Sequence, residues 1–104
     1  SNEYSGSVEI PATVYVYGTT YNVTSIGKDA FRGCSTLTSI NIPNSVTNIY
    51  DHAFSDCTSL ASVTIPGSVR KIWDTAFYGC TALESVSIGK GSRIRFLRVN
   101  CALL

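Results

Sequence analysis

Three stretches of the chain share one pattern: residues 26–37 read IGKDAFRGCSTL, residues 49–60 read IYDHAFSDCTSL, and residues 72–83 read IWDTAFYGCTAL. They align without a gap at a period of 23 residues. The apolar columns are Ile26/Ile49/Ile72, Ala30/Ala53/Ala76, Phe31/Phe54/Phe77, Cys34/Cys57/Cys80, Leu37/Leu60/Leu83, Ile40/Val63/Val86 and Ile42/Ile65/Ile88. A fixed period of this size is typical of proteins whose units stack on one another. The sequence therefore predicts a repeat solenoid with 23-residue coils.

Each coil contains two extended pieces separated by turns. The pattern Leu-x-x-Ile/Val-x-Ile places two apolar residues two apart, as a strand with one buried face requires. Pro43 or Pro66 follows at once and ends the strand, because proline has no N–H to donate. A second extended piece follows at 46–49 and 69–72, and the Ala-Phe-x-x-Cys segment is predicted to form a short helical turn. The fold class is therefore mainly β with short helical turns.

The N-terminal segment, residues 1–25, is predicted to be a cap that contains a β-hairpin. The pattern Ile-Pro-x-x-Val occurs at 10–14, but Ile26 arrives nine residues later than in the other coils. Residues 14–17 and 20–23 alternate in polarity, with Gly18-Thr19 between them, which is typical of a hairpin. We expect the hairpin to cover the open N-terminal end of the stack, since a first repeat has no neighbour.

The regular repeats span residues 26–89, and residues 90–104 are predicted to be a degenerate coil or a C-terminal cap, so that 1–104 forms a single domain. Cys101 is followed by Leu104 as in the Cys-x-x-Leu pattern, but no Ala-Phe pair precedes it. Arg93, Arg95 and Arg98 are the kind of charge that keeps an edge from pairing. Self-association through this C-terminal edge stays open as the alternative.

Composition excludes several classes of protein. Of the 104 residues, 44% are hydrophobic and 14% are charged, which indicates a folded chain. Its four cationic residues beyond position 89 are too few for the basic stripe of a nucleic-acid-binding face, so no nucleic-acid partner is expected. No apolar run approaches the roughly 18 residues of a membrane span, so none is expected in this chain.

The cysteines are predicted to be structural. Cys34, Cys57 and Cys80 occupy one repeat position and should stack as small buried side chains in the reduced state. A disulfide framework is the alternative for a small secreted chain. No close Cys-x2-4-Cys pair is present, so no metal site and no cofactor are expected.

An enzyme is not expected. His52 is the only histidine, and Asp51 and Ser55 lie beside it in one loop, an arrangement that does not hold a base between a nucleophile and an orienting group. No Gly-x-Ser-x-Gly elbow accompanies them. A solvated loop histidine is the favoured interpretation of His52.

The repeat, Ile-Pro-x-Ser-Val-x-x-Ile-x-x-x-Ala-Phe-x-x-Cys-x-x-Leu, resembles the BspA-like leucine-rich repeats over residues 8–89. The resemblance implies a leucine-rich-repeat fold and a secreted or cell-surface protein, typically of anaerobic bacteria or protozoan parasites, that acts in adhesion to host proteins or other cells. The family usually has glycine after the isoleucine that opens the Ala-Phe segment. Gly27 follows this pattern, whereas Tyr50 and Trp73 do not.

Two surfaces are candidates for binding. If the coils stack in register, Tyr50 and Trp73 lie about 5 Å apart at the backbone, with His52, Asp74 and Tyr78 nearby. Aromatic rings beside hydrogen-bonding groups are typical of a protein hot spot or a sugar platform, but aromatic pairs on sheets also serve stability alone. The second surface is the sheet face, whose side chains are small: Ser39, Asn41, Ser62, Thr64, Ser85 and Ser87.

Two functions remain open at this stage. The first is a non-catalytic binding module whose partner is a protein or glycan on a host or neighbouring cell. The second is a structural spacer within a longer repeat protein, with no ligand of its own. The small side chains of the sheet face suit a spacer or weak multivalent contact.

Overall fold

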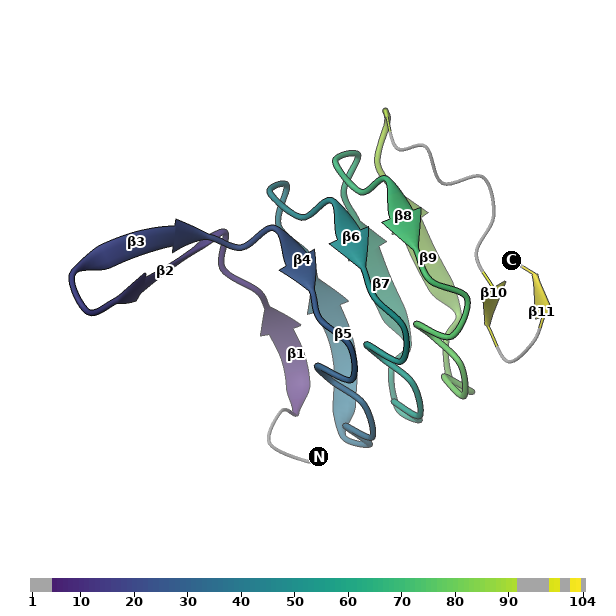
Figure 1. Ribbon diagram of the computed structural model, residues 1–104. Helices are drawn as coiled ribbons and strands as arrows, with labels where there is room; N and C mark the ends of the chain where they lie inside the picture. The colour runs from purple at the N-terminus through teal and green to yellow at the C-terminus, as the bar shows by residue number, and fades with distance from the viewer. Residues whose placement is uncertain (1–4, 92–97, 100–101, 104) are drawn as a thin grey trace.

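A computed structural model of the protein describes residues 5–91, 98–99 and 102–103, and it consists of strands joined by turns (Figure 1). A four-stranded parallel sheet has the order β1-β5-β7-β9, and a three-stranded parallel sheet has the order β4-β6-β8. Two antiparallel pairs, β2-β3 and β10-β11, complete the described strands. Their bounds are β1 Gly6–Glu9, β2 Thr13–Val16, β3 Thr19–Asn22, β4 Ser25–Ile26, β5 Leu37–Asn41, β6 Asn48–Ile49, β7 Ser62–Ile65, β8 Lys71–Ile72, β9 Ser85–Ile88, β10 Arg98–Val99 and β11 Ala102–Leu103.

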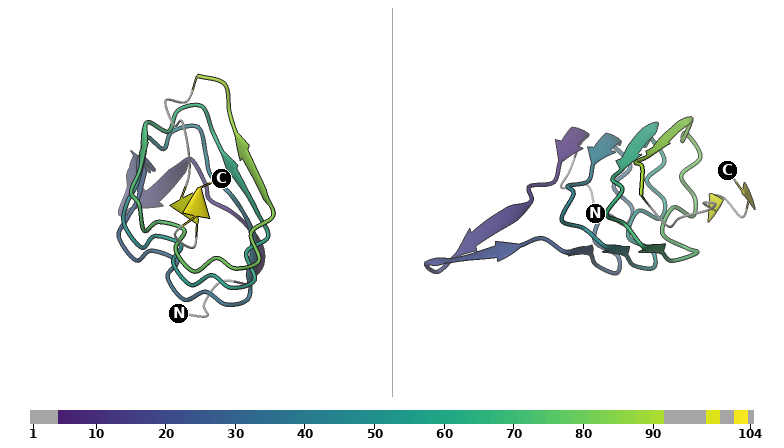
Figure 2. Two further views of the ribbon diagram at one scale, coloured as in Figure 1. Left: turned by 90° about the vertical axis from the view of Figure 1, so that its right-hand side faces the viewer. Right: turned by 90° about the horizontal axis from the view of Figure 1, so that it is seen from above.

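The two parallel sheets confirm the 23-residue repeat. Ile40 pairs with Val63, and Val63 pairs with Val86 in the larger sheet. In the smaller sheet Ile26, Ile49 and Ile72 pair in the same order. Viewed along the stack, successive coils follow nearly the same path (Figure 2, left). The interior between the sheets is filled by the repeat columns: Ile26, Phe31, Cys34, Leu37, Ile40, Ile42, Val46, Ile49, Ala53, Phe54, Cys57, Leu60, Val63, Ile65, Val69, Ala76, Phe77 and Cys80.

Two ladders inside the stack show how one coil supports the next. The Phe54 ring stacks between those of Phe31 and Phe77, with centroids 5.2 and 5.1 Å away. Cys34, Cys57 and Cys80 are buried and form no disulfide with one another, as the repeat predicted. The Cys57 thiol donates a hydrogen bond to the Phe31 carbonyl, and the Cys80 thiol donates one to the Phe54 carbonyl, both at 3.0 Å.

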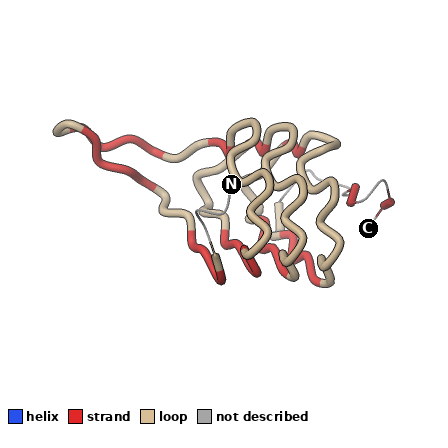
Figure 3. Tube along the Cα trace, turned by 90° about the horizontal axis from the view of Figure 1, so that it is seen from below, coloured by secondary structure: helices blue, strands red, loops and turns tan. Residues whose placement is uncertain are grey.

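The Ala-Phe-x-x-Cys segment corrects the sequence-based prediction, because it forms consecutive tight turns and the described residues contain no helix (Figure 3). The Ala53 amide closes such a turn on the Tyr50 carbonyl at 3.2 Å. The Phe54 and Asp56 amides instead donate to carbonyls of the following coil, at 2.7 and 2.8 Å. A helix would need these amides for its own ladder. His52 and Asp56 have φ near +60°, which also interrupts a right-handed helix.

The predicted N-terminal hairpin is present as β2 and β3, but it does not cover the stack. Its turn is Tyr17-Gly18, one residue earlier than predicted, and both residues have positive φ as a two-residue hairpin turn requires. Figures 1 and 3 show the hairpin projecting away from the coils, and all eight of its strand residues are exposed. The edge that the hairpin was expected to cover is occupied by β1, which pairs with β5.

At the other end, β10 and β11 form an antiparallel pair. Of the predicted C-terminal cap, residues 92–97, 100–101 and 104 lie outside the described residues, and these include Arg93 and Arg95. Self-association through this edge therefore stays a prediction.

Candidate functional site

Tyr50 and Trp73 are brought together by the register of the smaller sheet. Each follows a short strand, β6 or β8, and its amide donates to the preceding coil: Tyr50 to Ile26 at 2.9 Å, and Trp73 to Ile49 at 3.0 Å. The ring centroids lie 4.5 Å apart with a tilt of 31° between the planes. Both side chains are half-buried, so the rings contact each other and still present part of their surface to solvent.

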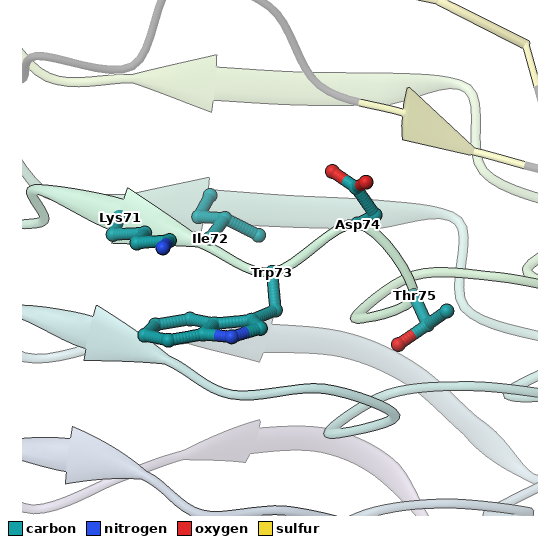
Figure 4. A pocket seen from close by; sticks show the side chains of 5 residues that line it. All are labelled: Lys71, Ile72, Trp73, Asp74 and Thr75. Carbon is teal, nitrogen blue, oxygen red and sulfur yellow. The ribbon is translucent and has the colours of Figure 1, made fainter.

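A lysine that the sequence analysis did not single out completes this cluster. The Lys71 ammonium lies 4.2 Å from the centre of the Trp73 indole, a cation–π contact. Figure 4 shows the indole nearly edge-on, directed toward the neighbouring coil, with Lys71 above it. A shallow hollow of about 320 Å³ is lined by Lys71, Ile72, Trp73, Asp74 and Thr75. The hollow therefore combines an aromatic wall with a cation, a carboxylate and a hydroxyl.

His52 is half-buried and hydrogen-bonded, which corrects the expectation of a solvated loop histidine. Its amide donates to the Thr75 hydroxyl at 3.2 Å. The buried Ser55 hydroxyl donates to the Thr75 carbonyl at 2.6 Å, which leaves its oxygen to accept from Nδ1–H of His52 at 3.0 Å. Because Ser55 is 1% exposed and its proton is held by a backbone carbonyl, this serine is not placed to attack a substrate.

Five residues were predicted to form the aromatic binding surface, and the structure brings two of them, Tyr50 and Trp73, into direct contact. Asp74 lines the hollow beside Trp73, and His52 reaches the same hollow only through Thr75. Tyr78 is 46% exposed and, in the part of the chain that the structure describes, takes part in no ring contact. We name the cluster of Tyr50, Lys71, Trp73, Asp74 and Thr75 the aromatic flank.

The sheet face is arranged in straight rows of small polar side chains. Ser39, Ser62 and Ser85 align across the strands, as do Asn41, Thr64 and Ser87. Strand β1 extends both rows with Ser7 and Glu9, and Ser39 and Ser7 are joined by a hydroxyl–hydroxyl hydrogen bond of 2.8 Å. Glu9, Asn41, Thr64 and Ser87 border a shallow hollow of about 440 Å³ at the end of the sheet. Strand β1 was not predicted in this face, although the repeated Ile-Pro at 10–11 signals it.

Within 5–91, 98–99 and 102–103, no group of three or more His, Cys, Asp or Glu side chains is arranged to hold a metal ion. The same residues contain no helix that is long and apolar enough to span a membrane.

Comparison with known proteins shows that the chain is similar to leucine-rich repeat proteins of bacteria. The sequence model of the BspA type leucine rich repeat region, in 6 copies, matches residues 8–99. No curated protein sequence matches the chain. Among solved structures, a leucine-rich repeat protein from Bacteroides ovatus is 41% identical with a TM-score of 0.74, over 80% of this chain and 24% of that one.

Two further solved structures are also similar to the chain. A leucine rich cell surface protein from Faecalibacterium prausnitzii is 37% identical with a TM-score of 0.70, over 86% of this chain and 26% of that one. A leucine rich repeat protein from T. pallidum is 32% identical with a TM-score of 0.69, over 80% of this chain and 40% of that one. The chain thus spans about a quarter of the length of the first two proteins. Because the family's repeat covers nearly all of the described coils, the chain belongs to the BspA-type leucine-rich repeat family.

Proposed function

We propose that this chain is a non-catalytic binding module of a secreted or cell-surface protein, and that it acts in adhesion by contacting a protein or a glycan of a host or neighbouring cell. One observation carries the proposal: Tyr50 and Trp73 form a half-exposed aromatic pair beside a hollow. Large aromatic side chains are enriched where binding energy is concentrated. The leucine-rich repeat is generally a non-catalytic binding fold, and the similar protein from F. prausnitzii is a cell surface protein.

The aromatic flank suits recognition better than the sheet face does. An indole wall provides apolar contact, while Lys71 and Asp74 offer a donor and an acceptor at its rim. The sheet face, in contrast, carries serine, threonine and asparagine, which contribute little anchoring surface. The alternative function, a spacer in a longer repeat protein, rests on those small side chains.

The proposal predicts that the double variant Tyr50→Gly/Trp73→Gly loses binding while the coils remain folded. Glycine is compatible with this column, because Gly27 occupies it in the first coil. Loss of a hot-spot pair costs about 2 kcal/mol or more, which is roughly 30-fold in Kd. Binding is measured on a glycan array and on immobilised extracellular-matrix proteins, and folding is measured by circular dichroism. Trp73 is the only tryptophan, so its fluorescence reports directly on a ligand at this flank.

A matched variant on the sheet face separates the alternatives. Ser62→Gly/Thr64→Gly alters β7, one of the two central strands of the larger sheet, and leaves the aromatic flank intact. We expect it to bind like the unmodified chain. Loss of binding in this variant alone would show that the binding site is on the sheet face. Folded protein without any binding on either panel would favour the spacer. A double variant on the flank that binds normally would show that the binding site is not the aromatic flank.

A further inference from the structure

The projecting hairpin has an apolar face that is exposed to solvent. Val14 pairs with Tyr21 and Val16 pairs with Thr19, so these four side chains lie on one face. Val14, Val16 and Tyr21 are 41, 44 and 54% exposed, and Tyr17 at the tip is fully exposed. A two-stranded hairpin alone is marginally stable in water, and three or more strands with a hydrophobic face are needed for independent stability. The hairpin therefore has the composition of part of a larger sheet.

Along the outer edge of β2, every second residue directs its backbone amide and carbonyl groups away from β3. The Val23 amide donates to the Ala12 carbonyl at 2.8 Å, so the residues that direct their backbone groups inward are Ala12, Val14 and Val16. The intervening residues, Thr13 and Tyr15, direct theirs outward. Among the strands that the structure describes, none pairs with this edge, because β2 has β3 as its one neighbour.

This edge also lacks the features that normally prevent strands from pairing. Edge strands are commonly protected by charged side chains or proline. Residues 10–27 contain no Asp, Glu, Lys or Arg, and neither β2 nor β3 contains proline. A second copy of the same hairpin would therefore meet no like charge and bury no unpaired charge. Neutral strands rich in valine and tyrosine are well suited to pair with one another.

We propose that two copies of this chain associate through the β2 edges of their hairpins, and form one antiparallel four-stranded sheet. Val14 of one copy then lies opposite Val14 of the other copy. The outward amide and carbonyl groups of Thr13 in each copy face those of Tyr15 in the other copy. The two apolar faces then lie on the same side of one sheet, which supplies the strand number that each hairpin lacks. The β3 edge is the poorer choice, because its outward residues are Thr20 and Asn22, and asparagine is depleted in strands.

Charge reversal at the symmetric position tests the proposal. Val14→Lys places two ammonium groups opposite each other, and Val14→Glu places two carboxylates there, so each variant alone should dimerise about ten-fold more weakly or worse. An equimolar mixture of the two should recover the association, since Lys then faces Glu. Thr20→Lys adds the same charge on the other edge of the same hairpin and should associate like the unmodified chain. Sedimentation velocity over a range of protein concentrations measures the dimer.

Three outcomes would overturn the proposal. The first is an unmodified chain that stays monomeric at every concentration. The second is equal weakening by Val14→Lys and Thr20→Lys, which would show that the β2 edge is not the contact. The third is a mixture of the two Val14 variants that stays monomeric while circular dichroism shows that both are folded, because opposite charges would then have no position at which to meet.

Discussion

Phe54→Ala is expected to lower the free energy of unfolding by about 3–5 kcal/mol. Phe54 is 0% exposed, and its ring stacks on Phe31 and Phe77 in the coils on either side. The space left by the ring cannot close easily, because backbone hydrogen bonds fix the separation of the coils: Phe31 donates to Ala53 and Phe54 donates to Ala76, each at 2.7 Å. A domain of this size has roughly 5–15 kcal/mol in total, so the variant should be largely destabilised.

Urea denaturation followed by circular dichroism measures this loss, and Tyr78→Ala is the matched control. Tyr78 is also an aromatic residue of the repeat's turn region, but it is 46% exposed, and its removal should change stability by no more than about 0.5 kcal/mol. Equal midpoints for the two variants would show that the phenylalanine ladder does not support the fold.

The repeat columns could be predicted from the sequence because the period alone determines which residues align. Once Ile49 lies beside Ile26 and Ile72, every other column follows at the same offset, including the contact of Tyr50 with Trp73. The turns in the Ala-Phe segment could not be predicted in this way. Their geometry depends on which amides bond to the next coil, and that choice is made only when the coils stack.

The remaining differences also have physical causes. The direction of the hairpin depends on the chain path after β1, which local alternation does not specify. Lys71 contacts Trp73 through a long side chain whose conformation no repeat period determines. His52 is hydrogen-bonded because Ser55 is held by Thr75 of the following coil, and a sequence pattern within one loop does not contain that neighbour.

The cysteine ladder gives the second large effect: in the native protein, Cys57 and Cys80 are expected to react with iodoacetamide about a thousand-fold more slowly than an exposed thiol. Both are buried, and each donates its proton to a backbone carbonyl. Alkylation therefore requires the coils to open, and an opening that costs about 5 kcal/mol or more reduces the rate by a factor of at least a thousand.

At Cys80 the thiolate, which is the reactive form, is suppressed as well, whereas the hydrogen bond with Cys80 lowers the pKa of the Cys57 thiol. The hydrogen bond with Cys57 and burial both raise the pKa of the Cys80 thiol, so near neutral pH it stays protonated in the folded protein. Its alkylation should increase with pH and with denaturant.

Peptide mass spectrometry after a short pulse of reagent measures each cysteine separately, in the presence and absence of urea. Ser59→Cys provides the control, because position 59 is exposed and lies two residues from Cys57 in the same coil. The introduced thiol should react at once in the native state, while Cys57 reacts only after unfolding. Equal rates at the two positions would show that Cys57 lies on the surface. A Cys57–Cys80 disulfide in the native mass spectrum would show that a covalent bond, and not the hydrogen-bonded ladder, links the two coils.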